Sequence, residues 1–185
     1  MILSIYDDRR TVFRLTDIAM ITGITNFQSL NQKIHYQVKK GSLLNPRKGI
    51  YAKPGYSREE LACNLFTPSY ISLEYVLQKE GIVFQYDSRI TSVSYLARTV
   101  EVSGVTYRFR KLKGEILTNP AGIHSTPTHV NIATAERALL DLMYLSPDSY
   151  PDNPHSLDKD LLDKLLSVYG SEQLARRIHK LLRNG

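Results

Sequence analysis

The chain has 185 residues, of which 42% are hydrophobic, so it can bury one large core or two small ones. It lacks the run of roughly eighteen apolar residues that a membrane span needs, and its first segment, MILSIYDDRR, reaches acidic residues too early for a signal peptide. A single cysteine, Cys63, excludes an intrachain disulfide framework and a cysteine-rich zinc site. We therefore expect a soluble protein of the cytoplasm.

The net charge of +6 is distributed unevenly along the chain. Residues 1–58 contain ten Lys and Arg against three Asp, a balance of +7, whereas the other 127 residues hold fourteen bases and fifteen acids, a balance of −1. This asymmetry is typical of a polyanion-binding module joined to a near-neutral domain. On charge alone, an ordinary basic surface exposed to solvent is an equal alternative.

The sequence near the N-terminus predicts a short helix that ends at a tight turn. Thr16 is typical of an N-cap, and residues 17–22 continue as a helix. Gly23 follows, where a helix end calls for a residue that tolerates positive φ. Thr25 and Gln28 have the spacing of a capping box, which predicts that a second helix starts directly after the turn.

The second helix presents one apolar stripe and one polar face. Four apolar residues recur at helical spacing before the helix ends near Gly41: Phe27, Leu30, Ile34 and Val38. We expect all four to face the core. The opposite face carries side chains that can donate and accept hydrogen bonds at base edges. We assign base reading to Asn26, Gln28, Ser29, Gln32, Lys33 and Tyr36, with His35 on the same face.

A predicted hairpin follows the second helix. Two β-capable pieces, residues 43–44 and 50–52, flank the turn-forming residues 45–49. A helix-turn-helix followed by a hairpin with a basic tip indicates a winged helix, which we place at residues 1–55. The candidate phosphate contacts are Arg14, Lys39, Lys40, Arg47 and Lys48. The alternative is a plain amphipathic helix in a small bundle, beside an ordinary hairpin.

Residues 56–185 predict a mixed α/β domain. Helices are predicted near 59–66 and 72–80, at 135–145, and as a closing pair near 157–169 and 172–183. Strand-like runs occupy 82–86, 90–95, 99–102, 105–112 and a piece near 130–132, with Ser103-Gly104 as a two-residue hairpin turn. The whole chain is therefore expected to be α+β: a winged helix-turn-helix domain, then a mixed α/β domain ending in a helical hairpin.

A second basic stripe lies in this later domain. Its members are Arg108, Arg110, Lys111 and Lys113. We interpret it as a solvated strand edge that discourages pairing between sheets, and keep a protein or RNA contact as the alternative.

Signatures of catalysis are nearly absent from the sequence. It has no phosphate-cradling glycine loop, no nucleophile elbow and no HExxH motif. His124 and His129 lie in a predicted loop with no cysteine nearby, so we interpret them as exposed polar residues. Glu136 and Asp141 are five residues apart on one helix, a spacing that does not align a catalytic pair. We expect a protein that is not an enzyme and that has no metal and no cofactor.

Four segments resemble the AbiEi family, the abortive-infection antitoxins of type IV toxin–antitoxin systems and related bacterial transcriptional regulators. They are LTDIAMITGITNFQSLNQKI, VKKGSLLNPRKGIYAKPGYS, LACNLFTPSYISLEYVLQKEGI and IATAERALLDLMYL, which together run from residue 15 to residue 145. The blocks PSYISLE and IATAERALLD are the more specific ones, because winged-helix segments are alike across many families. The segment before Thr16 is short, so the first helix of the winged domain would be shortened to residues 2–8 or missing.

The resemblance implies a transcriptional autorepressor with a role in phage defence. Its DNA partner would be the double-stranded promoter of its own operon, and it would counter a nucleotidyltransferase-type toxin encoded next door without requiring a stable complex. Gln28, Ser29, Gln32 and Lys33 would read bases, and Lys48 would be the wing contact.

The resemblance also implies a set of signature residues in the second domain. These are Pro68, Tyr70, Ser72, Glu74, Glu136, Arg137 and Asp141. We expect them to be structural: Ser72 as a helix cap, and a Glu–Arg pair joining two elements. The competing hypothesis is a protein-interaction module in which the winged helix is only a scaffold and the later domain binds a partner protein.

Overall fold

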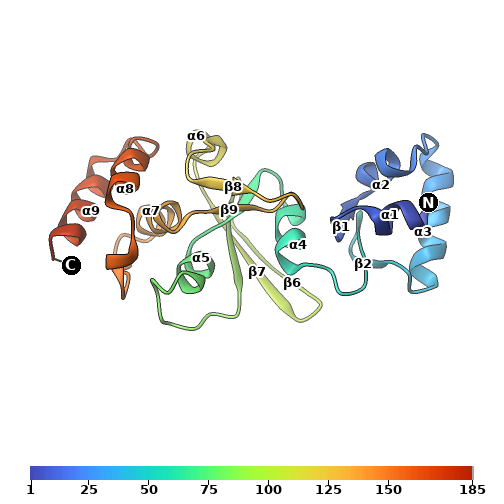
Figure 1. The fold of residues 1–185 in the computed structure, drawn as a ribbon, viewed down its shortest axis with the longest axis horizontal. Coiled ribbons are helices and arrows are strands. Elements are labelled where there is room, and N and C mark those ends of the chain that lie inside the picture. The colour runs from blue at the N-terminus through green and yellow to red at the C-terminus, as the bar shows by residue number, and fades with distance from the viewer. Residues whose placement is uncertain (185) are drawn as a thin grey trace.

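The structure, a computed structural model, describes residues 1–184 and is a mixed α+β fold with two sheets, as the sequence predicts. Its long axis runs from the N-terminal helices, through a six-stranded sheet, to the C-terminal helices (Figure 1). The elements of residues 1–55 are α1 (Ile2–Asp7), β1 (Val12–Arg14), α2 (Leu15–Thr22), α3 (Phe27–Lys39), β2 (Leu44–Arg47) and β3 (Ile50–Ala52).

The N-terminal sheet has the order β1-β3-β2 and is antiparallel throughout. The predicted hairpin is confirmed as β2–β3, where Arg47 pairs with Ile50. The predicted short helix at residues 2–8 is confirmed as α1. Strand β1 was not predicted, because three residues are too few to show the alternation that marks a strand. Three helices and one sheet face enclose a small core of Ile5, Phe13, Ile18, Leu30, Ile34, Leu43 and Tyr51.

The remaining chain forms the larger part of the molecule. Its elements are α4 (Arg58–Leu65), β4 (Ser69–Ile71), α5 (Glu74–Lys79), β5 (Ile90–Ser94), β6 (Arg98–Val102), β7 (Val105–Lys111), α6 (Gly114–Thr118), β8 (Ile123–Ser125), β9 (Asn131–Ala133), α7 (Ala135–Leu145), η1 (Pro154–Ser156), α8 (Lys159–Leu166) and α9 (Glu172–Asn184). The predicted helix at 135–145 is confirmed, whereas β4, α6 and β8 were not predicted.

The six strands form a mixed sheet in the order β6-β7-β5-β4-β9-β8. Strands β5 and β7 run parallel, as do β4 and β9, and the other neighbours are antiparallel. The turn between β6 and β7 is confirmed at Ser103 and Gly104, whose φ angles of 52° and 74° are those that a tight hairpin turn requires.

Residues 82–86, predicted as a strand, form a loop instead. The backbone N–H groups of Ile82 and Val83 donate to the carbonyl oxygen of Leu77 at 2.8 and 3.2 Å, which completes the C-terminal end of α5. These amides are therefore unavailable to a strand ladder, and the aromatic residues that follow, Phe84 and Tyr86, are exposed.

Helices cover the two faces of the large sheet. Phe66, just after α4, contacts Phe109 of β7 edge to face, with ring centroids 4.8 Å apart. Arg110 points to the opposite face, where it donates to the carbonyl oxygen of Leu145 in α7 at 2.9 Å. Helices α8 and α9 lie beyond α7, at the end of the molecule away from α3 (Figure 1).

Helix α4 joins the N-terminal elements to the large sheet. The buried carboxylate of Glu60, 3% exposed, accepts hydrogen bonds from the backbone N–H groups of Thr11 at 2.6 Å and Val12 at 3.0 Å. Val12, Ile50 and Ala52 belong to the larger hydrophobic core rather than to the small one. The junction is thus both apolar and hydrogen-bonded.

Candidate nucleic-acid interface

Helices α2 and α3 meet at a tight turn on the N-terminal surface. Gly23 ends α2 in the left-handed conformation, with φ of 68°, as predicted. The N-cap of α3 is Asn26, whose side-chain oxygen accepts from the backbone N–H of Ser29 at 3.0 Å, so the predicted Thr25 cap is wrong by one residue. The N-cap of α2 is Arg14 rather than the predicted Thr16, because Asp17 accepts from the Arg14 backbone N–H at 2.7 Å.

The inward face of α3 matches the prediction in part. Leu30 and Ile34 are fully buried, and Val38 is half-buried against the same core. Phe27 is 49% exposed, so its assignment to the core is wrong. It is the first residue of the helix, and the small core ends before reaching it.

The outward face of α3 is polar and exposed. Gln28, Gln32, Lys33, His35, Tyr36 and Lys39 are exposed on this helix, and Ser29 is half-buried. Within residues 1–184, none of these side chains hydrogen-bonds to another group, so their donors and acceptors are free for a ligand. Asn26 is also exposed, but its oxygen is committed to the cap and only its amide nitrogen is free.

The five predicted phosphate contacts divide into two groups. Lys39, Lys40 and Lys48 are exposed. The Arg14 guanidinium instead donates to α4 and the residues after it, at 3.0 Å to a carbonyl and 2.5 Å to the Thr67 hydroxyl. The Arg47 guanidinium lies over the Phe66 ring, 5.2 Å from its centroid.

Both arginines therefore face the junction with α4. Their role as phosphate contacts stays a prediction, and both guanidiniums are engaged with protein groups in this structure. Arg14 is the last residue of β1 and Arg47 the last of β2. Both strands belong to the sheet that packs on α4, so both side chains lie close to that helix.

Four of the seven signature residues converge in the core of the large part. The Asp141 carboxylate accepts from the hydroxyls of Tyr70 at 3.0 Å, Ser72 at 2.7 Å and Tyr169 at 2.6 Å. Arg137 lies one helical turn away, with Nε 3.6 Å from the carboxylate. Arg137 and Asp141 are both completely buried. Ser72 therefore binds Asp141 instead of capping a helix, and the ion pair of Arg137 is with Asp141, not with a glutamate.

Further hydrogen bonds satisfy the other polar groups of this buried cluster. Arg137 donates to the carbonyl oxygens of Ala121 at 3.0 Å and Ile116 at 2.7 Å, and to the Tyr70 hydroxyl at 3.0 Å. Burial raises the pKa of both Tyr70 and Tyr169, so these phenols stay protonated and donate to the carboxylate. Closed to solvent and satisfied internally, the cluster joins β4, α6, α7 and the turn before α9. Tyr169 was missed because no local pattern connects it to Asp141.

The other three signature residues lie apart from the cluster. Pro68 is exposed before β4. One carboxylate oxygen of Glu74 is buried without a hydrogen-bond partner among the described residues. Glu136 accepts from the backbone N–H of Asp158 at 3.1 Å and so holds the start of α8.

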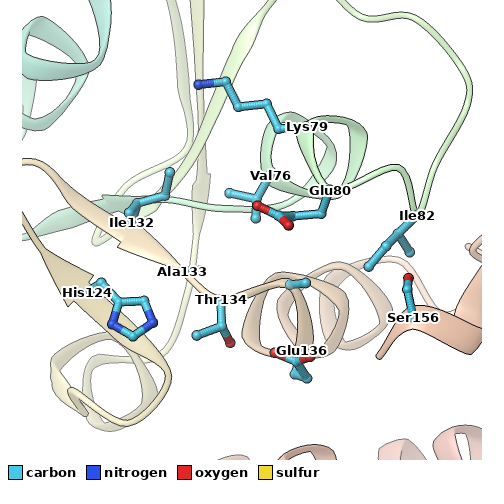
Figure 2. Close-up of a pocket in the computed structure, with 11 residues that line it drawn as sticks. Val76, Lys79, Glu80, Ile82, His124, Ile132, Ala133, Thr134, Glu136 and Ser156 are labelled. Carbon is cyan, nitrogen blue, oxygen red and sulfur yellow. The ribbon is translucent and has the colours of Figure 1, made fainter. Parts of the chain in front are cut away.

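A cavity of about 400 Å³ lies between α5, β9 and the start of α7, as Figure 2 shows. His124 on β8 and Glu136 on α7 line it, while the Lys79 ammonium is directed away from both, toward its ion pair with Glu59. In the described part of the chain, no cluster of three or more His, Cys, Asp or Glu side chains is arranged to hold a metal ion.

No protein-family model and no curated protein matches the chain. Over residues 1–184, no helix combines the length and apolar character needed to cross a bilayer.

Proposed function

We propose that the protein is a DNA-binding transcriptional autorepressor whose residues 1–55 act as a winged helix with α3 as the recognition helix. The observation that carries this proposal is the outward face of α3, where exposed amide, imidazole and phenol groups have no partner within the described chain. Solvated helix faces ordinarily carry mostly Glu and Lys, whereas this face carries Gln, His and Tyr beside its lysines. Gln side chains suit the base edge of adenine, and Lys suits that of guanine. A helix-turn-helix followed by the β2–β3 hairpin supports the same function.

Bases and phosphates would be contacted by different side chains. Gln28 and Gln32 lie one turn apart on α3 and would read base edges. Lys39 and Lys40, at the end of α3, and Lys48, at the hairpin tip, would hold phosphates. Because Arg47 turns toward Phe66, Lys48 is the cation that the hairpin offers to DNA.

Mobility shifts on the DNA upstream of the gene test this proposal. Gln32→Ala should reduce the preference for that DNA over random duplex by about 5- to 150-fold, because one bidentate contact contributes about 1–3 kcal/mol of discrimination. Lys39→Ala/Lys48→Ala should weaken binding to every duplex and lower the salt slope by about 1.8, roughly 0.9 for each phosphate contact. Lys159→Ala/Lys164→Ala on α8 is the control of equal charge change. Equal binding of upstream and random DNA by the unmodified protein would disprove specific repression.

We further propose that the protein is an antitoxin of a type IV toxin–antitoxin system. This part rests on the AbiEi-like segments, of which PSYISLE and IATAERALLD contain Tyr70, Ser72, Arg137 and Asp141 of the buried cluster. Cells that express a nucleotidyltransferase-like toxin from the adjacent gene should stop growing, and co-expression of this protein should restore their growth. Growth arrest that persists with the folded protein present would reject this role, and would leave the DNA-binding proposal standing.

A protein-interaction module is the second candidate, and one observation favours it. Phe84, Tyr86 and Tyr150 are 70%, 81% and 69% exposed. Their two loops are tied together, because the Phe84 backbone N–H donates to the Asp152 carboxylate at 2.7 Å. Co-purification with the neighbouring gene product at a salt concentration that abolishes DNA binding would support this candidate. The Phe84→Ser/Tyr86→Ser variant should then fail to co-purify with that product.

A further inference from the structure

One edge of the large sheet is formed by β6, not by β7. Strand β7 pairs with β6 on one side and with β5 on the other, so its basic residues lie on an interior strand. The interpretation of Arg108 and Arg110 as residues of a strand edge therefore does not hold. The strand at that edge is β6, which has five residues and could pair with a further strand.

The other strand edges of the two sheets are covered, interrupted or short. The Glu60 carboxylate takes up the backbone N–H groups of Thr11 and Val12 at the edge formed by β1. Pro46 removes one donor from β2, and β8 has three residues. By contrast, among residues 1–184 the backbone of β6 makes no hydrogen bond to any element other than β7.

The hairpin turn determines which backbone groups of β6 face outward. A two-residue turn joins β6 to β7, so the flanking Val102 and Val105 exchange hydrogen bonds within the hairpin. Bonded and non-bonded pairs alternate along an antiparallel ladder, so the N–H and C=O groups of Thr99 and Glu101 point away from β7. Both residues are exposed, so this edge is open to a further strand.

One face of this edge carries an acid and a base that are not paired within the chain. Glu101 and Arg108 project from the same face of the sheet, because Arg108 lies opposite Thr99. In the described residues, neither side chain takes part in an ion pair. Asp87, an acid that Arg108 acts on at longer range, is itself bound by Arg89 at 2.6 Å. Both Glu101 and Arg108 are therefore available to a partner.

A second copy of the chain complements this edge. When Val100 of one copy lies opposite Val100 of the other in an antiparallel pair, Thr99 of each copy exchanges backbone hydrogen bonds with Glu101 of the other. Glu101 of the second copy then lies two strands, about 10 Å, from Arg108 of the first, and these long side chains can meet over the small Thr99. The twofold axis repeats this contact. A register that places the two Glu101 side chains opposite each other is disfavoured, because like charges repel.

We propose that β6 is a dimerisation surface, at which two copies of this chain join their sheets through antiparallel β6 strands and reciprocal Arg108–Glu101 ion pairs. The contact between two five-residue strands is small, so we expect a transient dimer with Kd in the micromolar range. The surface is separate from α3, which lies at the end of the molecule beyond α4 (Figure 1). It therefore does not depend on the repressor proposal.

Sedimentation equilibrium of the full-length chain over the micromolar range measures the dimer. Thr99→Pro removes an outward-facing N–H that β7 does not use, and should raise Kd at least about tenfold. Glu101→Lys and Arg108→Glu should each raise Kd at least about fivefold, because the attraction in both symmetric contacts is replaced by repulsion. Glu80→Lys at the end of α5 and Arg176→Glu on α9 are exposed controls of equal charge change, and should leave Kd unchanged.

A mixture of the two charge variants separates a contact between copies from an effect within one chain. When a Glu101→Lys chain pairs with an Arg108→Glu chain, every contact joins opposite charges again. The mixed dimer should therefore form at least about tenfold more tightly than either variant with itself, measured by sedimentation with a fluorescent label on one variant. Far-UV circular dichroism and Tm confirm that each variant is folded.

Three results would overturn the proposal. A chain that stays monomeric throughout the concentration range leaves the edge to a strand of another protein. Self-association that Thr99→Pro and both charge variants leave unchanged places the contact on another surface. A mixture that associates no more tightly than its two components shows that Glu101 and Arg108 do not meet across the dimer.

Discussion

The Glu60 carboxylate provides a direct test of how α4 holds the N-terminal elements. It accepts two backbone hydrogen bonds, from Thr11 and Val12, and each such bond to a charged acceptor contributes about 1.5–3 kcal/mol. Because burying a carboxylate itself costs several kcal/mol, the net loss falls below the sum. We expect Glu60→Ala to lower the free energy of unfolding by about 3 kcal/mol, which lowers Tm by about 6–12 °C for a chain of this size.

Urea and thermal unfolding, followed by far-UV circular dichroism and by tyrosine fluorescence, measure this change. Glu60→Gln retains an uncharged acceptor and should lose only about 1 kcal/mol. Glu80→Ala, at an exposed helix end, is the matched control and should stay within about 0.5 kcal/mol of the parent. The reasoning is refuted if Glu60→Ala and Glu80→Ala have the same urea midpoint and Tm. The hydrogen bonds of the Thr11 and Val12 amides to Glu60 would then contribute nothing to stability.

Two further predictions concern buried residues beside the six-stranded sheet. Gly122 has φ of 71°, and an added Cβ would lie 3.0 Å from Arg137 Cβ and from Leu165 Cδ1. Gly122→Ala should therefore destabilise the protein by about 2 kcal/mol or more in urea unfolding, and an unchanged midpoint would contradict this. Gly114→Ala, whose Cβ would meet nothing within 4 Å, is its control. Arg137→Met or Asp141→Ala alone should each cost about 3–5 kcal/mol, because each leaves a buried charge unpaired. The double variant should cost clearly less than the sum, and additive losses would show that the two charges are not coupled.

Elements whose signals lie within a few neighbouring residues were predictable. The α2–α3 turn follows from Gly23, and α7 follows from the apolar periodicity of residues 135–145. Strands β1 and β4 were not predictable, because each has three residues and exists only through pairing with strands distant in the sequence. The segment 82–86 has strand composition, but the end of α5 uses its amides.

The candidate interface shows the same division. The amphipathic pattern of α3 predicted which side chains face outward, with Phe27 as the exception at the end of the helix. The directions of Arg14 and Arg47 depended on α4, which lies beside them only in the folded chain. The position of the basic residues of β7 likewise needed the sheet order, since β7 is an interior strand only because β6 pairs with its outer side.

The sequence by itself determined the local framework: helix periodicity, turns at glycine, the uneven charge, and the polar face of α3. These depend on the spacing of neighbouring residues and on backbone preferences that act over one or two turns. Only the tertiary structure decided which polar groups are committed and which are free. Asp141 is occupied by Tyr70, Ser72 and Tyr169, which lie 71, 69 and 28 residues away, and such partners are chosen by packing rather than by spacing. The side chains left free by that packing are the ones available to a ligand.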